Sequence, residues 1–202
     1  VLEYLEEGYQ PDALRYATAA NLPEYTDTDI SEAELIRRIN DELANDWGNL
    51  VNRVFAMTHK NFAGTVPDPG ELEEPDTTLL DTVDGHLAAA ADLLEKVELR
   101  AALKEALAAA QATNAYLNRM EPWKTAKTDR ERTGRTLYTA LQAIDGIAIA
   151  FAPYTPNSSD TILGLLGHEG GAQAHGWQRR EVTPGTELGE AQPLFQKIDL
   201  PD

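Results

Sequence analysis

The longest regular pattern of apolar residues in the chain runs from residue 35 to residue 62. Aliphatic and aromatic residues recur there every three or four positions, and a period of about 3.6 residues places them on one face of an α-helix. The preceding stretch SEAE, Ser31 to Glu34, has the form of a capping box, in which the serine oxygen accepts an amide hydrogen bond at the helix start and the glutamate returns the bond. Gly64 and the stretch VPDPG follow the pattern and oppose a helix. We therefore expect one helix of about eight turns between these signals.

Shorter helical patterns lie on both sides of this helix. Pro11 suits the first turn of a helix because its fixed φ angle is already helical, whereas Pro122 and Pro153 interrupt helical patterns. No stretch shows the alternation of apolar and polar residues that is typical of strands. The expected helices are a short one beginning near Pro11, one over 76–96, an alanine-rich one over 98–120, one from about 128 that ends before Pro153, and a short one within 155–167, with Asn157 to Ser159 as candidate caps and Gly167 as its end.

This order of elements predicts an all-α fold, an antiparallel helix bundle with short or moderate connections. After Gly167 the chain is rich in Gly, Gln and Pro and has little period, so we expect a largely irregular C-terminal tail in which PLFQKIDLPD lies back on the bundle as an extended segment. We divide the chain into an N-terminal helical connector over 1–30, a bundle over 31–167 and a tail over 168–202.

Composition is that of an ordinary globular chain. At 202 residues with 42% hydrophobic content, the chain can bury a sizeable core. The absence of cysteine excludes disulfides and thiolate zinc sites and fits a reducing compartment. No apolar run reaches the roughly 18 residues that a membrane span needs. We expect a cytoplasmic protein without a membrane partner and, because the chain opens with Val1 in mid-pattern, a piece of a longer one.

Charge is strongly acidic on average but unevenly distributed. The formal net charge of −17, from 34 acidic and 17 basic residues, argues against general binding of DNA or other nucleic acids, which requires Lys and Arg. Residues 119–135, however, contain six basic and three acidic residues, a local balance of +3, whereas residues 68–100 contain ten acidic and two basic residues, a balance of −8. A charge run is often only a solvated face. The acidic remainder is also consistent with a high-salt cytoplasm.

No constellation of catalytic or metal-binding residues is present. The four histidines, His59, His86, His168 and His175, stand at spacings that do not suit a shared metal. HEGGAQAH differs from a zinc-protease helix, in which the two histidines are four residues apart, and its glycines oppose a helix. No glycine-rich phosphate loop follows a strand, and no serine lies on a nucleophile elbow. We expect neither a catalytic residue nor a metal or cofactor site in this chain.

Two groups of side chains have the chemistry of a nucleic-acid reader. Trp123 directly follows a proline at a helix break and precedes Lys124 and Lys127, while Asn49 and Arg53 stand one turn apart on the long helix. Each group also has a structural interpretation. Most tryptophans fill cores, and an Asn–Arg pair four residues apart can be a surface cap or a bridge to a neighbouring helix.

Taken together, the two groups fit recognition of single-stranded RNA. Such RNA is read by stacking bases on an aromatic platform and by hydrogen bonds to their exposed edges, while cations hold the phosphates. An amide offers both donor and acceptor to a base edge, and a guanidinium offers a donor fork that also stacks. A helical bundle without an RNA role predicts instead that Asn49, Arg53 and Trp123 are scattered or buried.

Several long stretches resemble one known family, the methionyl-tRNA synthetases, in their C-terminal anticodon-binding region. Residues 8–30 resemble the segment that joins the catalytic fold of that family to its helical bundle, and the end of the chain resembles the end of the bacterial-type enzymes. The matching stretches are GYQPDALRYATAANLPEYTDTDI, NDWGNLVNRVFAMTHKNFAGTVPDPGEL, NAYLNRMEPWKTAKTDRERTGRTLYTALQAI, FAPYTPNSSDTILGLLG and PLFQKIDLPD.

The resemblance implies a partner and site residues. Asn49 and Arg53 in NLVNR match residues of the family that contact anticodon bases, and Trp123 in EPW matches the tryptophan on which the first anticodon base, a cytosine, stacks. The implied partner is therefore methionine tRNA with its CAU anticodon. Charge alone adds Lys124, Lys127 and Arg130 as possible phosphate contacts.

The resemblance also implies what lies outside this chain. The two nucleotide-binding signatures of the family and its whole catalytic fold are absent from the sequence, so we expect ATP and Mg to bind in a separate catalytic domain of the same enzyme. This chain alone is expected neither to activate methionine nor to charge tRNA. The alternative is a free-standing, synthetase-derived module that binds tRNA or another protein without catalysis.

Overall fold

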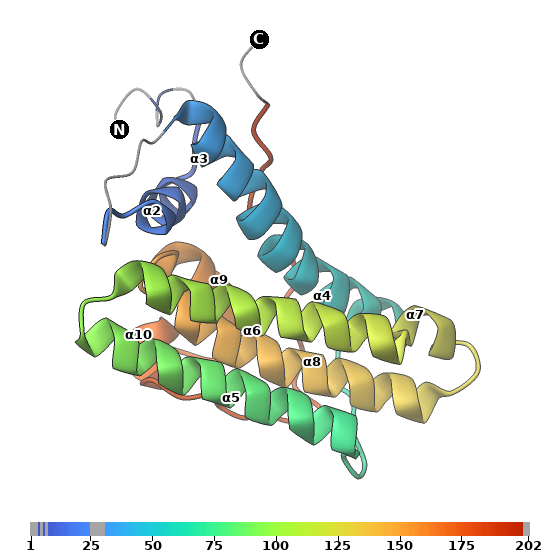
Figure 1. Ribbon diagram of the computed structural model, residues 1–202. Helices are drawn as coiled ribbons and strands as arrows, with labels where there is room; N and C mark the ends of the chain where they lie inside the picture. The colour runs from blue at the N-terminus through green and yellow to red at the C-terminus, as the bar shows by residue number, and fades with distance from the viewer. Residues whose placement is uncertain (1–3, 5, 7, 25–30, 200–202) are drawn as a thin grey trace.

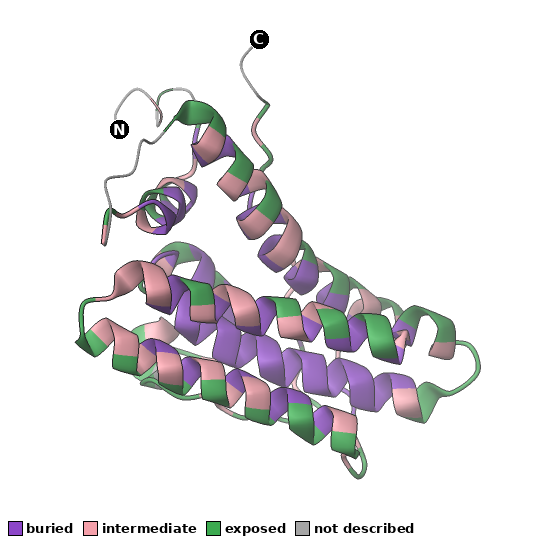
Figure 2. Cartoon of the chain, in the orientation of Figure 1, coloured by how far each residue is buried: buried purple, intermediate pink, exposed green. Residues whose placement is uncertain are grey.

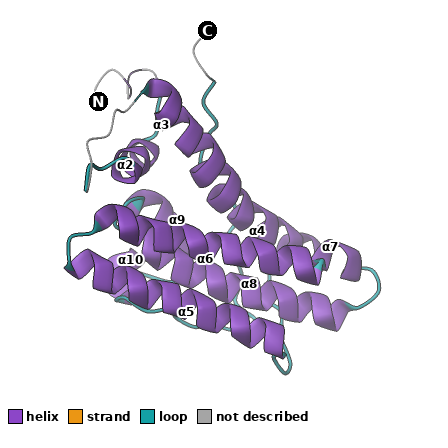
Figure 3. Ribbon diagram, in the orientation of Figure 1, coloured by secondary structure: helices purple, strands orange, loops and turns teal. Residues whose placement is uncertain are grey.

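The computed structural model describes residues 4, 6, 8–24 and 31–199, and all regular elements in this part of the chain are helices (Figure 3). The expected all-α class is therefore confirmed. None of the described helices is long and apolar enough to span a bilayer. The elements are α2 (Pro11–Ala20), α3 (Glu32–Arg38), the π-helical η1 (Ile39–Gly48), α4 (Asn49–Phe62), α5 (Glu74–Glu95), α6 (Leu99–Met120), α7 (Pro122–Thr125), α8 (Arg130–Phe151), α9 (Pro156–Leu165) and α10 (Gly171–His175).

The predicted long helix forms as one continuous run made of α3, η1 and α4. The Ser31 hydroxyl accepts a hydrogen bond from the Glu34 amide at 3.2 Å, as predicted, but the Glu34 carboxylate pairs with Arg37 and Arg38 at 2.8 and 2.9 Å and does not complete the capping box. The ten π-helical residues of η1 were not expected. Apolar residues three and four positions apart fit an α-helix as well as a π-helix, so the sequence pattern does not predict the wider π-helical turns.

Helices α5, α6 and α8 lie side by side and form the body of the bundle (Figure 1). The α3–η1–α4 run crosses them at an angle, with α2 packed against α3, η1 and α6. Helix α8 is central: every residue from Thr133 to Phe151 is buried (Figure 2). The ring of Phe151 stacks on Trp47 at 5.3 Å and lies near Tyr16 at 6.2 Å, which joins α8 to η1 and α2 in one core.

Several polar side chains of α8 contact partners on other elements. The Gln142 side chain exchanges two hydrogen bonds with the backbone of Val182, at 2.8 and 3.1 Å. Arg135 lies 3.2 Å from the fully buried carboxylate of Asp76, which also accepts a hydrogen bond from Tyr116 at 2.5 Å. These contacts link α8 to the tail, α5 and α6, because a buried polar group is costly unless it is paired.

The C-terminal tail runs along the bundle and back to the N-terminal helices. Thr186 accepts a hydrogen bond from Val66 at 2.9 Å, and the only β-bridge of the described residues joins the same stretch, between Thr65 and Glu187. Farther on, the backbone of Ile198 exchanges two hydrogen bonds with Asn40, at 2.8 and 2.9 Å. The expectation that PLFQKIDLPD lies back on the body is confirmed up to residue 199; residues 200–202 lie outside the described part.

Two local predictions about the end of the bundle were wrong. Asn157 to Ser159 lie inside α9 and do not cap it, since its cap residue is Thr155 and its first residue is a proline. The carboxylate of Asp12, on α2, accepts hydrogen bonds from the amide and hydroxyl of Ser158 at 2.7 and 2.8 Å. The stretch HEGGAQAH, whose glycines were expected to oppose a helix, contains the short α10, which packs on α9.

Candidate nucleic-acid interface

The first turn of α4 separates an apolar face from a polar one. Leu50, Val51 and Val54 are fully buried, whereas Asn49 and Arg53, four residues apart, are both exposed. A spacing of four residues places side chains above one another on the same helix face. The predicted pairing of Asn49 and Arg53 on one exposed face is thus present in the fold.

A sharp turn between α6 and α7 presents Trp123 to solvent. Glu121 adopts the left-handed conformation with φ of 50°, which costs a non-glycine residue about 1 kcal/mol. Pro122 then begins α7 and is buried. The Trp123 side chain that follows is 43% exposed. The interpretation of this tryptophan as a core residue is therefore excluded.

Arg53 and Trp123 meet across the two elements. The Cζ atom of Arg53 lies over the indole, 5.8 Å from the ring centre, within the range of a cation–π contact. One guanidinium nitrogen donates to the Asn114 side-chain oxygen at 3.3 Å. Partial desolvation lowers the Arg53 pKa below that of a free guanidinium, because desolvation disfavours the charged form. The cation is therefore held less hydrated than a free surface arginine, which strengthens its electrostatic contacts.

Polar residues that sequence reasoning missed continue this surface between α6 and the η1–α4 run. The Asn114 amide donates to the Asp46 backbone carbonyl at 2.8 Å, and the Gln111 amide donates to the Asp46 carboxylate at 3.0 Å. We refer to Asp46, Arg53, Gln111 and Asn114 as the polar seam. The spacing of Gln111 and Asn114 on an otherwise alanine-rich stretch was the available signal, but it did not indicate which helix they would face.

The three cations proposed as phosphate contacts follow Trp123 along the chain and are all exposed. Lys124 pairs with Glu121 at 2.6 Å, and the Arg130 guanidinium lies over the Phe62 ring at 4.5 Å. Among the described residues, no hydrogen bond or ion pair involves the Lys127 side chain. The three therefore differ in how much of their charge is already engaged within the protein.

The described histidines with defined side chains have structural partners. His59 contacts the Gly189 carbonyl at 3.0 Å, and His86 contacts Glu105 at 2.7 Å. His168 lies 3.0 Å from the buried Asp145, and burial lowers the His168 pKa. Within the described part of the chain, no three His, Cys, Asp or Glu side chains are grouped so that they could hold a metal.

Two family models match the chain. The model described as the anticodon binding domain of methionyl tRNA ligase matches residues 66–201, and the model described as tRNA synthetases class I (M) matches residues 1–55. Residues 56–65, which include the end of α4, lie between the two matches. The division into a connector over 1–30, a bundle over 31–167 and a tail over 168–202 stays a prediction.

Curated relatives are methionine–tRNA ligases. The enzyme of Roseiflexus castenholzii is 39% identical over 221 residues, which cover 96% of this chain and 37% of the relative. The enzyme of Corynebacterium urealyticum is 39% identical over 239 residues, which cover 98% of this chain and 39% of the relative. The chain thus spans less than two fifths of the length of these relatives.

Solved structures with the same fold come from Mycobacterium tuberculosis methionyl-tRNA synthetase. The apo form superposes with a TM-score of 0.88 at 31% identity and covers 98% of this chain and 41% of that chain. The form bound by methionyl-adenylate superposes with a TM-score of 0.87 at 31% identity and covers 96% of this chain and 39% of that chain. The bundle described above is therefore similar to about two fifths of these synthetase chains.

Proposed function

The chain belongs to the family of methionyl-tRNA ligase anticodon-binding domains, and from this premise we propose that it recognises the CAU anticodon of methionine tRNA. The observation that supports this best is the contact between Arg53 and the exposed Trp123 indole. An aromatic platform beside a donor fork and an amide has the composition of a reader of unpaired bases.

Each of the three side chains has its own role in this proposal. The exposed part of the Trp123 ring receives the first anticodon base by stacking. Arg53 and Asn49 face the same surface and hydrogen-bond to base edges. Within the described part of the chain, the Asn49 side-chain amide makes one long contact, of 3.4 Å to Asn45, which RNA can displace. Lys124, Lys127 and Arg130 approach the phosphates of the loop.

The activity that we propose for the whole protein is ligation of methionine to its tRNA in the cytoplasm. A catalytic domain of the class I type, outside this chain, binds ATP and Mg and performs the chemistry. Binding energy gained at the anticodon then positions the acceptor end of the tRNA, because remote contacts can be used to orient a reacting group. The relatives reported above are ligases, which supports this interpretation over a free-standing module.

Replacing the indole tests the proposal directly. Loss of one stacked base costs about 1 to 3 kcal/mol, so Trp123→Ala is expected to weaken binding of a methionine-tRNA anticodon stem-loop by roughly ten- to a hundredfold. Trp123→Phe retains a smaller stacking surface and is expected to bind with intermediate affinity. Fluorescence anisotropy titration at a fixed salt concentration measures both values.

Trp177→Ala is the matched control. The Trp177 side chain is also partly exposed, at 36%, but its indole nitrogen donates to the Leu87 carbonyl on α5 at 2.7 Å, away from α4 and α7. This variant is expected to bind RNA as the unaltered chain does. Equal affinity of Trp123→Ala and Trp177→Ala, with both folded by circular dichroism, would reject the proposed site.

A further inference from the structure

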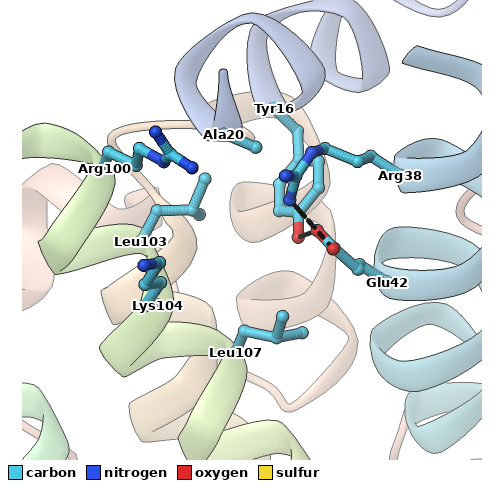
Figure 4. A pocket seen from close by; sticks show the side chains of 8 residues that line it. All are labelled: Tyr16, Ala20, Arg38, Glu42, Arg100, Leu103, Lys104 and Leu107. Carbon is cyan, nitrogen blue, oxygen red and sulfur yellow. Dashed lines mark hydrogen bonds and ion pairs between the residues drawn. The ribbon is translucent and has the colours of Figure 1, made fainter. Parts of the chain in front are cut away.

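A second concentration of positive charge lies in a pocket between α2, the α3–η1 junction and α6 (Figure 4). The pocket has a volume of about 180 Å³, room for a phosphate group with bridging water at about 30 Å³ per water molecule. Arg38 and Glu42 project from one side, Arg100 and Lys104 from the other, and Tyr16 from above (Figure 4).

The single carboxylate in the pocket is already neutralised. Glu42 accepts hydrogen bonds from Arg38 at 3.0 Å and from the Tyr16 hydroxyl at 2.7 Å. Burial, together with the charge of Glu42, raises the Tyr16 pKa, so the hydroxyl keeps the proton that it donates. Arg38 also pairs with Glu34, at 2.9 Å, so two carboxylates engage Arg38 and it adds no free positive charge to the pocket.

The cations on α6 have no such partner. Among the described residues, the side chains of Arg100 and Lys104 form neither a hydrogen bond nor an ion pair, and the buried Nε of Arg100 is unsatisfied. The nearby Glu24 carboxylate accepts from the Arg100 backbone amide at 2.6 Å and so caps α6. The second oxygen of Glu24 is also buried without a hydrogen bond, but Glu24 does not line the pocket, and among the described residues the lining carries two cations outside any ion pair. A buried donor without an acceptor is costly, and an anion supplies acceptors.

The pocket and the proposed anticodon site both lie where the α3–η1–α4 run faces α6, the pocket at Arg38 and the anticodon site at Arg53. Arg38, Asp46 and Arg53 follow one side of the continuous helix in steps of seven or eight residues, and the polar seam closes the space between that helix and α6. Fifteen residues separate Arg38 from Arg53, which at the α-helical rise of about 1.5 Å per residue amounts to at most roughly 22 Å, and the π-helical η1 shortens this distance. That distance exceeds the length of one nucleotide.

We propose that this pocket binds a backbone phosphate of the tRNA stem that adjoins the anticodon loop, through Arg100 and Lys104. The inference rests on the proposed function, since it requires an RNA whose loop bases are held at Trp123. With the loop fixed there, the backbone that reaches the pocket some 20 Å away is that of the stem. Phosphate contacts of this kind fix the register of a nucleic acid without reading its sequence.

Neutral variants of the two cations test the pocket. Arg100→Gln and Lys104→Gln remove charge while keeping a polar side chain, and Lys104 is exposed, so its replacement leaves the core intact. Each variant is expected to weaken binding of a stem-loop with a full-length stem by about three- to tenfold at low salt. Each is also expected to reduce the slope of log affinity against log salt by about one.

Lys197→Gln is the matched charge control. Lys197 is exposed and precedes Ile198, whose backbone binds Asn40. Asn40 stands two residues after Arg38, so it projects from the opposite side of the same helix. This variant loses the same charge and is expected to change neither the affinity nor the salt slope.

Two further arms identify the source of the phosphate. A stem-loop cut to two base pairs is expected to bind the pocket variants and the unaltered chain equally. An equal loss on the short and full-length stems would overturn the assignment to the stem. In the second arm, millimolar inorganic phosphate replaces chloride at constant ionic strength. The loss of affinity caused by the variants is expected to stay the same. If phosphate abolishes that loss, the pocket is a site for a free anion instead.

Comparison with Trp123→Ala separates this inference from the proposed function. If Trp123→Ala weakens binding but Arg100→Gln and Lys104→Gln bind the full-length stem-loop with unchanged affinity and salt slope, only the pocket assignment is wrong. If Trp123→Ala also has no effect, the proposed function itself is wrong.

Discussion

The guanidinium of Arg53 lies where α4, α6 and α7 converge, beside the Trp123 ring and within hydrogen-bond distance of Asn114. Because its position is fixed by two neighbours, little side-chain freedom remains to be lost on binding RNA. A guanidinium held in this way can act as a base-edge reader or as a phosphate clamp. The two roles differ in how affinity responds to the sequence of the RNA.

Binding to stem-loops with altered anticodons distinguishes these roles for Arg53. If Arg53 reads base edges, Arg53→Ala is expected to lower the preference for CAU over single-base variants by about ten- to a hundredfold, corresponding to roughly 1 to 3 kcal/mol per base contact. Lys127→Ala, at a proposed phosphate contact, is expected to weaken all stem-loops by the same factor. A uniform loss for Arg53→Ala would assign Arg53 to the phosphates instead.

At the scale of elements, α8 and the C-terminal tail are joined by a buried acid. Asp145 is fully buried, accepts a hydrogen bond from the Arg180 amide at 2.7 Å and lies 3.0 Å from His168. Burial raises the Asp145 pKa to about 6 from its usual 3.8. The folded chain therefore binds this proton more tightly than the unfolded chain does, and the associated stability is present below about pH 4 and is lost as the pH rises through 6.

Asp145→Asn is expected to remove this dependence on pH. The amide oxygen can still accept from the Arg180 amide, but no charge is buried, so the variant gains stability relative to the unaltered chain as the pH rises from about 4 to 6. Above pH 6 the gain is constant, at about 1 to 3 kcal/mol. Urea unfolding at pH 4.5 and pH 7.5 measures the difference. If the difference in unfolding free energy between Asp145→Asn and the unaltered chain does not change with pH, the raised pKa of Asp145 would be contradicted.

The elements that sequence predicted well are those fixed by local signals. Apolar period and proline breaks located the long helices, and Gly167, with φ of 89°, ends the helical stretch as expected. The carboxylate at the start of α9 could not be predicted, because Asp12, which accepts from the Ser158 amide, is 146 residues away from Ser158. The same limit applies to function: Trp123 stood out by its neighbours, whereas the pocket around Arg100 exists only because α2, η1 and α6 meet.

At the scale of the whole molecule, the stability of the acidic chain and its proposed affinity for RNA are expected to respond to salt in opposite directions. A net charge of −17 destabilises the folded state through mutual repulsion. Salt shortens the screening length from about 10 Å at 0.1 M to about 3 Å at 1 M. Positive charge in this acidic chain is concentrated at the pocket and along residues 119–135, so RNA contacts lose strength under the conditions that relieve the repulsion.

The melting temperature of the chain is therefore expected to rise with potassium chloride concentration. Screening worth about 1 kcal/mol corresponds to roughly 2 to 4 °C in a chain of this size. Over the same range, the affinity for the anticodon stem-loop is expected to fall steeply. Differential scanning calorimetry between 0.1 and 2 M salt measures the melting temperature. A melting temperature that stays constant or falls as salt is added would exclude charge repulsion as a significant destabilisation of the folded chain.

Gly48 links the end of the chain to the surface proposed to meet RNA. A Cβ atom at this position would stand 3.1 Å from Cδ2 of Phe195, so the aromatic ring rests almost directly on the backbone immediately before Asn49. Phe195 is itself buried, with 7% of its surface exposed. A segment almost 150 residues downstream thus packs against the helical run immediately before Asn49, and shortening the chain before Phe195 would remove a support of the helix turn that carries Asn49 and Arg53.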